Sequence, residues 1–253
     1  MATRRSTKTG LVEIGQYQNA PIYLHSGFFV TAILLAWPFW YMVSPRGLAL
    51  AILFMATIFV SILAHELAHA AMARRYGLPM QRIDIHMLGG IVQYWHFPHT
   101  RRQDLVITAA GPGSNLLIGL VALAFLVTMP HAAETILGRQ DVPGLPTDAF
   151  LEQLLRATAY LNLGLFAVNM IPAFPLDGGK LAHLLIEERW GPRVATLVVG
   201  ALGLVFACIS TLVTLSTALA GLPIWAPPGF RINWRAFQAA CRGLGGWDRF
   251  AFR

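Results

Sequence analysis

The chain has 253 residues, of which 56% are hydrophobic and only 12% are charged, and its net charge is +7 at pH 7. A soluble globular protein has about twice this share of charged residues, so the composition excludes an ordinary soluble enzyme and indicates a multi-pass membrane protein. The positive residues flank apolar runs instead of forming one basic surface. This pattern is typical of membrane topology signals and argues against nucleic-acid binding.

The first apolar run extends from about residue 21 to 43 and predicts a membrane span. A polar stretch separates it from the basic residues near the N-terminus, whereas a cleaved signal peptide places its apolar core directly after them. His25, near its start, is interpreted as an interfacial or packed histidine. A turn at 44–47 leads to a second span at 48–73, which exceeds the roughly 20 helical residues that cross a bilayer.

The second span contains the pattern His-Glu-Leu-Ala-His at residues 65–69. On a helix, residues four apart share a face, so His65 and His69 can bind one cation while Glu66 accepts a proton from a metal-bound water. Charged groups at membrane depth each cost at least about 2.5 kcal/mol, and they usually mark a functional site. The alternative is a chance occurrence of the pattern on an ordinary helix.

A β-hairpin is expected between the second and third spans. Two β-prone runs, 83–88 and 91–95, flank Gly89-Gly90, and a glycine pair between such runs suits a tight turn. The hairpin is expected to dip toward the membrane, and its edge could bind an extended peptide. The segment also contains three histidines, His86, His96 and His99. They could be additional metal ligands, but histidines in a polar loop are more commonly solvated or interfacial.

The third span covers 105–129 and opens with the small-residue stretch 109–115. Small residues let another helix approach closely, and this is favoured over a direct role for Asn115 in the site. Residues 130–150 are expected to form an external loop, and a fourth span follows at about 150–171.

Asp177 lies just after the fourth span, in the sequence Asn-Met-Ile-Pro-Ala-Phe-Pro-Leu-Asp-Gly-Gly at 169–179. The two prolines stop the helix and the two glycines free the backbone, so a carboxylate is held at a break in a membrane helix. Asp177 can also cap a short helix from Gly178 to about Trp190, and capping is compatible with metal binding.

The last part of the chain, 194–253, contains an apolar run at 194–222, which predicts one or two spans. An amphipathic tail follows from residue 231 and could lie along a membrane surface. Basic residues precede the first span and follow the second, so the positive-inside rule places the N-terminus, the histidine motif and Asp177 toward the cytoplasm.

The two motifs together resemble those of the site-2 protease family, which are membrane-embedded zinc metalloproteases. The resemblance covers roughly residues 48–190 and is closest to compact bacterial forms without a PDZ or nucleotide-sensing domain, which implies a bacterial cytoplasmic (inner) membrane. It implies one Zn²⁺ ion per chain, with His65, His69 and Asp177 as ligands and Glu66 as the catalytic glutamate. Asn169 and the pair Gly89-Gly90 correspond to positions expected to contact the substrate or the transition state.

The expected fold is an all-α polytopic membrane protein. It has five to six transmembrane helices and a membrane-associated β-hairpin, in a single protease domain over 1–253 with a catalytic core at about 48–190. The expected activity is that of an intramembrane zinc endopeptidase that cleaves peptide bonds within or near transmembrane segments of membrane proteins, in an oligomeric state that the sequence does not specify. The alternative is a metal-ion transporter or metal-binding receptor, which has no need of a general base beside its first histidine.

Overall fold

Helices make up most of the computed structural model, which describes residues 10–40, 44–86, 89–95, 100–129, 149–219 and 229–245. Within these residues, three helices are long and apolar enough to cross a membrane: α3 (Pro45–Arg75), α4 (Arg101–Leu126) and α7 (Asp177–Leu219). The protein is therefore a multi-pass membrane protein, as its composition predicts. The expected total of five to six spans stays a prediction.

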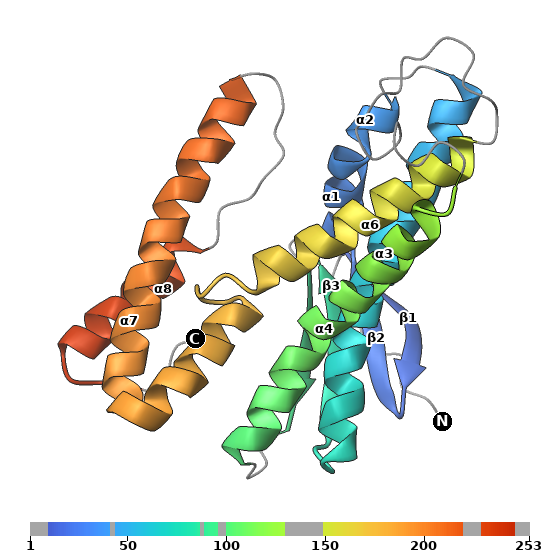
Figure 1. Ribbon diagram of the computed structural model, residues 1–253. Coiled ribbons are helices and arrows are strands. Elements are labelled where there is room, and N and C mark those ends of the chain that lie inside the picture. The colour runs from blue at the N-terminus through green and yellow to red at the C-terminus, as the bar shows by residue number, and fades with distance from the viewer. Residues whose placement is uncertain are drawn as a thin grey trace. The chain divides into compact units, whose positions relative to one another are not determined.

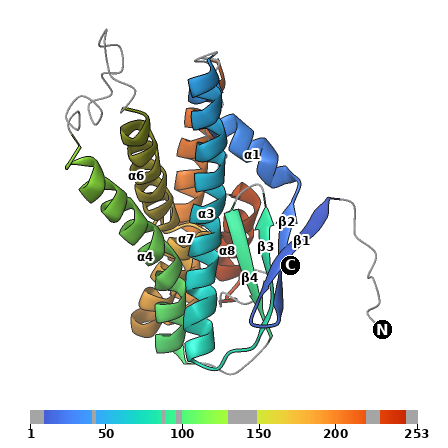
Figure 2. The ribbon, with the colours of Figure 1, turned by 90° about the vertical axis from the view of Figure 1, so that its right-hand side faces the viewer.

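A four-stranded sheet corrects the expectation of an all-α fold. Its strands lie in sequence order: β1 (Leu11–Tyr17), β2 (Ala20–His25), β3 (Met80–His86) and β4 (Gly89–Tyr94). The expected hairpin forms from β3 and β4, and a second hairpin, β1–β2, pairs with it through a parallel contact between β2 and β3. Figure 2 shows β4 next to α3 and β1 on the far side of the sheet.

The expected first span over 21–43 is divided in the structure. Its first residues form β2, and the helices α1 (Gly27–Leu35) and α2 (Trp37–Trp40) follow with a break at Ala36. Pro38 has no N–H to donate to the carbonyl of Leu34, which explains why the helix does not continue regularly. Residues 41–43 lie outside the described residues.

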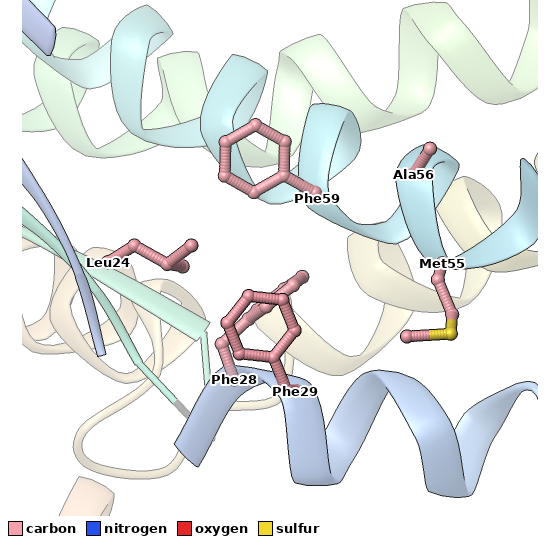
Figure 3. Close-up of a pocket in the computed structure, with 6 residues that line it drawn as sticks. All are labelled: Leu24, Phe28, Phe29, Met55, Ala56 and Phe59. Carbon is pink, nitrogen blue, oxygen red and sulfur yellow. The ribbon is translucent and has the colours of Figure 1, made fainter. Parts of the chain in front are cut away.

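An apolar core joins the sheet to α1 and α3. Ile22, Ile83 and Ile85 from the strands pack there with Phe28 and Ile58 from the helices. A hollow of about 240 Å³ lies between β2, α1 and α3 (Figure 3), and its lining is entirely apolar: Leu24, Phe28, Phe29, Met55, Ala56 and Phe59. This hollow has no group for acid–base or metal chemistry.

The chain packs as two units, one formed by residues 1–98 and 113–164 and the other by 99–112 and 165–253. Both α4 and the helix α6 (Ala149–Asn169) contribute residues to each unit, so the units are not consecutive domains along the sequence. The domain boundaries expected from the sequence stay predictions.

In the second unit, α7 bends sharply at Gly191, where φ is 81° and ψ is 166°, and Pro192 follows (Figure 1). The part of α7 before the bend ends at Trp190, as predicted for the short helix after Asp177. The helix α8 (Phe230–Cys241) packs against α7, and Arg193 Nε donates a hydrogen bond of 2.9 Å to the carbonyl of Ala240. The predicted amphipathic tail therefore includes a helix that has one face buried on the protein.

Candidate active site

Helix α3 carries the histidine motif, and its start is well defined by sequence. Pro45 is its first residue, and Ser44 caps it by accepting a hydrogen bond of 3.0 Å from the Gly47 N–H. From Pro45 the helix continues for 31 residues to Arg75 without a further proline.

The motif residues of α3 are buried in the protein. His65, Glu66 and His69 are 7%, 4% and 9% exposed, respectively. The Nε2 atoms of His65 and His69 are 3.1 Å apart, as expected for residues four apart on one helical face.

His65, His69 and Asp177 form a group that could hold a metal ion, because one potential ligand atom from each lies within 4.8 Å of the others. Two donors at about 2.1 Å from a tetrahedral zinc lie roughly 3.4 Å apart, so the spacing of the two imidazoles fits zinc. Two histidines and one carboxylate also form a donor set that catalytic zinc sites use. This group combines the two histidines of the first motif with the aspartate of the second, and their role as zinc ligands stays a prediction.

Among the described residues, this group does not include His86, one of the other histidines expected as possible ligands. His86 is at the end of β3, with its ring centroid 6.2 Å from that of His25, and both lie near the buried carboxylate of Asp84. Burial lowers the pKa of His86, the positive charge that His25 can carry lowers it further, and Asp84 opposes both effects. His96 and His99 lie outside the described residues.

Asn115 contacts the first histidine directly. Its side-chain oxygen accepts a hydrogen bond of 2.5 Å from His65 Nδ1, and Asn115 is fully buried. An amide oxygen only accepts, so Nδ1 carries the proton and Nε2 keeps its lone pair for a metal. From the sequence, the small-residue stretch 109–115 was expected to serve helix packing. The structure adds the contact of Asn115 with His65. The helix also continues through Pro112 without a break.

Two further polar residues, Ser61 and Asn162, hold Asn115 in this orientation. The Asn115 amide nitrogen donates to Asn162 Oδ1 at 3.0 Å and to the Ser61 carbonyl at 3.3 Å, and Asn162 Nδ2 donates to Ser61 Oγ at 3.0 Å. These contacts fix which end of the Asn115 amide faces His65. Neither Ser61 nor Asn162 is among the site residues predicted from the sequence. The available signals were a serine one turn before His65 and an asparagine within an apolar helix.

Gly90 lies against Glu66. A methyl group at position 90 would overlap the Glu66 side chain and lie only 2.6 Å from Oε1. The prediction that Gly89-Gly90 forms the hairpin turn is wrong, because both residues are paired within β4, Gly89 with His86 and Gly90 with Ile85. The glycine at position 90 is explained by close packing against the glutamate. The intervening residues 87–88 lie outside the described residues.

Asp177 is the first residue of α7 and follows a compact turn after Asn169, the last residue of α6. The two glycines after Asp177 are helical, so they do not serve to free the backbone as expected. A methyl group at Gly178 would lie 2.5 Å from the Ile171 carbonyl oxygen, and one at Gly179 would lie 2.5 Å from that of Ala173. Both positions therefore exclude a larger residue, because the preceding turn packs directly on the start of the helix.

Comparisons with known proteins agree with this geometry. The model of Peptidase family M50 matches residues 53–210, which is more than half of the chain. Among curated proteins, zinc metalloprotease MJ0392 of Methanocaldococcus jannaschii is 28% identical over 201 residues, covering 79% of this chain and 53% of the relative. The putative zinc metalloprotease YwhC of Bacillus subtilis is 28% identical over 193 residues, covering 67% of this chain and 82% of the relative.

The chain spans about half the length of the first curated relatives it matches. Among solved structures, a site-2 protease from Methanocaldococcus jannaschii matches with a TM-score of 0.58 and 22% identity, covering 96% of each chain. This likeness shows a shared fold. Together with the family match, it confirms the resemblance that the two motifs indicate: the chain belongs to Peptidase family M50, the family of membrane-embedded zinc metalloproteases that includes the site-2 proteases.

Proposed function

We propose that the protein is an intramembrane zinc endopeptidase that cleaves peptide bonds within or near transmembrane segments of membrane proteins. The observation that carries this proposal is the grouping of His65, His69 and Asp177 next to the buried Glu66. In this proposal the three residues hold one zinc ion per chain. When bound there, zinc acts as a Lewis acid and lowers the pKa of a coordinated water to about 7.

Glu66 acts as the general base in this proposal. Its carboxylate accepts the proton of the attacking water and passes it to the leaving amine. Gly90 leaves the space in which the glutamate side chain lies. Asn115 keeps His65 in the tautomer whose Nε2 can bind the metal.

Strand β4 is proposed to bind the substrate in extended form. It lies at one end of the strand order, and Gly90 within it packs against Glu66. A peptide that adds to β4 as a further strand would gain main-chain hydrogen bonds close to the proposed base. A transmembrane helix must unwind locally to bind in this way, so substrates with helix-weakening residues near the cut are favoured. Asn169 is proposed to assist in binding the substrate or the transition state.

The proposed orientation places the active site toward the cytoplasm of a bacterium. Arg74 and Arg75 end α3, and Arg101 and Arg102 begin α4, which makes this end of the helices the positive side. A cysteine introduced at Gly77 should react with a membrane-impermeant maleimide in inverted vesicles. Reaction in spheroplasts instead would reverse the orientation.

Cleavage of a single-span substrate by the purified protein tests the activity. The Glu66→Gln variant keeps the shape of the side chain but cannot accept a proton, so it should cleave about 10²- to 10⁴-fold more slowly than the wild type. Removing zinc should abolish cleavage, and adding it back should restore the rate. Equal cleavage by Glu66→Gln would refute the mechanism. Zinc uptake into vesicles that is unaffected by this substitution would favour the transporter alternative.

A further inference from the structure

Asn233 on α8 binds the backbone of Phe174, three residues before Asp177. Its Oδ1 accepts a hydrogen bond of 3.0 Å from the Phe174 N–H, and its Nδ2 donates one of 2.7 Å to the Phe174 carbonyl. Both residues are fully buried. The side-chain amide thus pairs with both polar groups of one peptide residue, as a neighbouring strand would.

Phe174 belongs to the turn that leads into α7. Within this turn, the Leu176 N–H donates to the Ala173 carbonyl at 2.9 Å, and the Gly179 N–H donates to the Leu176 carbonyl at 3.0 Å. The Phe174 ring is buried against Val199 and Ala236. A short chain of hydrogen bonds therefore connects Asn233 to the first turn of the helix that carries Asp177.

Two glycines of α7 allow α8 to come this close. A methyl group at Gly203 would overlap the side-chain amide of Asn233, and one at Gly200 would lie 2.9 Å from the backbone nitrogen of Phe237. Buried asparagine on an otherwise amphipathic helix is costly unless its amide is satisfied. Here Nδ2 also donates to the Gly229 carbonyl at 3.0 Å, so both of its hydrogens are used.

We propose that Asn233 is a positioning residue for the metal site: α8 holds the turn at 171–176 so that Asp177 is presented as a ligand. The proposal rests on the proposed function in taking Asp177 as a zinc ligand. Helix α8 lies outside the segment 53–210 that the family model matches. A part of the chain outside the two motifs would thus contribute to zinc affinity without touching the metal.

Zinc titration of the full-length apoprotein in detergent, against a chromophoric chelator, tests this proposal. The Asn233→Ala variant should raise the zinc Kd about tenfold or more, the range seen when a residue that orients a ligand is removed. Asn233→Asp keeps the acceptor for the Phe174 N–H and loses the donor, so its Kd should be intermediate. Gln238→Ala removes a side-chain amide elsewhere on α8 and should match the wild type.

Gly203→Ala provides a second test that does not substitute Asn233 itself. Alanine favours the helix, so this change should not lower the helical content measured by circular dichroism. It should nevertheless raise the zinc Kd, because the added methyl displaces the Asn233 amide. If Asn233→Ala does not fold, Asn233→Asp and Gly203→Ala carry the test.

Asp177→Ala separates failure of this inference from failure of the proposed function. If Asp177→Ala loses zinc while the Asn233 and Gly203 variants bind it as tightly as the wild type, the positioning role is refuted and the ligand set stands. An equal rise in Kd for Gln238→Ala would also refute it, because general loosening of α8 would then explain the effect. If Asp177→Ala binds zinc normally, the proposed ligand set itself fails.

Discussion

Replacing Asn115 by alanine should weaken zinc binding more than it weakens the fold. In the zinc-bound protein, His65 must keep its proton on Nδ1, and Asn115 supplies the acceptor at 2.5 Å. Without it, a buried donor is left unsatisfied at a cost of about 1–3 kcal/mol. The apoprotein avoids this cost, because an unligated imidazole can change its tautomer. Because only the zinc-bound protein has this cost of about 1–3 kcal/mol, the zinc Kd should increase roughly 5- to 150-fold.

Competitive titration with a chelator of known affinity measures this change directly. Asn115→Asp provides the matched variant. Its carboxylate also accepts from Nδ1–H but loses the donors to Asn162 and Ser61, so its zinc Kd should rise less than that of Asn115→Ala. Asn162→Ala serves as a control, because it disrupts the same buried network without removing the acceptor of His65. Wild-type affinity in Asn115→Ala, or an equal loss in Asn162→Ala, would refute the reasoning.

Three further predictions concern the base, the metal and the sheet. Gly90→Ala should abolish cleavage while the zinc content stays normal, because the added methyl displaces the Glu66 side chain. Gly15→Ala is the control, because a methyl group at this position of the same sheet would have no atom within 4 Å, and this variant should cleave normally. Normal cleavage by both variants would contradict the packing argument. Adding zinc to the metal-free wild type at 100 times its Kd should stabilise the fold by about 2.7 kcal/mol, seen as a higher Tm; the same shift in His65→Ala would count against the site. The pKa of His86, followed by NMR, should lie below the usual value for histidine. It should rise in His25→Gln and fall further in Asp84→Asn, and no response to either substitution would contradict the effects assigned to His25 and Asp84.

The local motifs could be identified from sequence because each depends on short-range geometry. The spacing of His65 and His69 places both on one face of any helix, whatever surrounds it. The short helix after Asp177 was also predictable, because the prolines before it and Gly191-Pro192 after it define its limits.

Several of the errors share a physical cause, which is that a residue's partner lies far away in sequence. β2 lies at the start of an apolar run, and one of the strands that it pairs with, β3, begins only at Met80. The pair Gly89-Gly90 has the composition of a turn, and the contact that requires a glycine at position 90 comes from another element. Asn233 pairs with a turn 59 residues earlier, which no local pattern indicates.

The most direct test of the account is the zinc content of purified variants, measured by mass spectrometry together with cleavage of a single-span substrate. His65→Ala, His69→Ala and Asp177→Ala should each lose both zinc and activity. Glu66→Gln should keep one zinc per chain and lose activity alone. Undiminished zinc in any of the three ligand variants, or full activity in Glu66→Gln, would contradict the account.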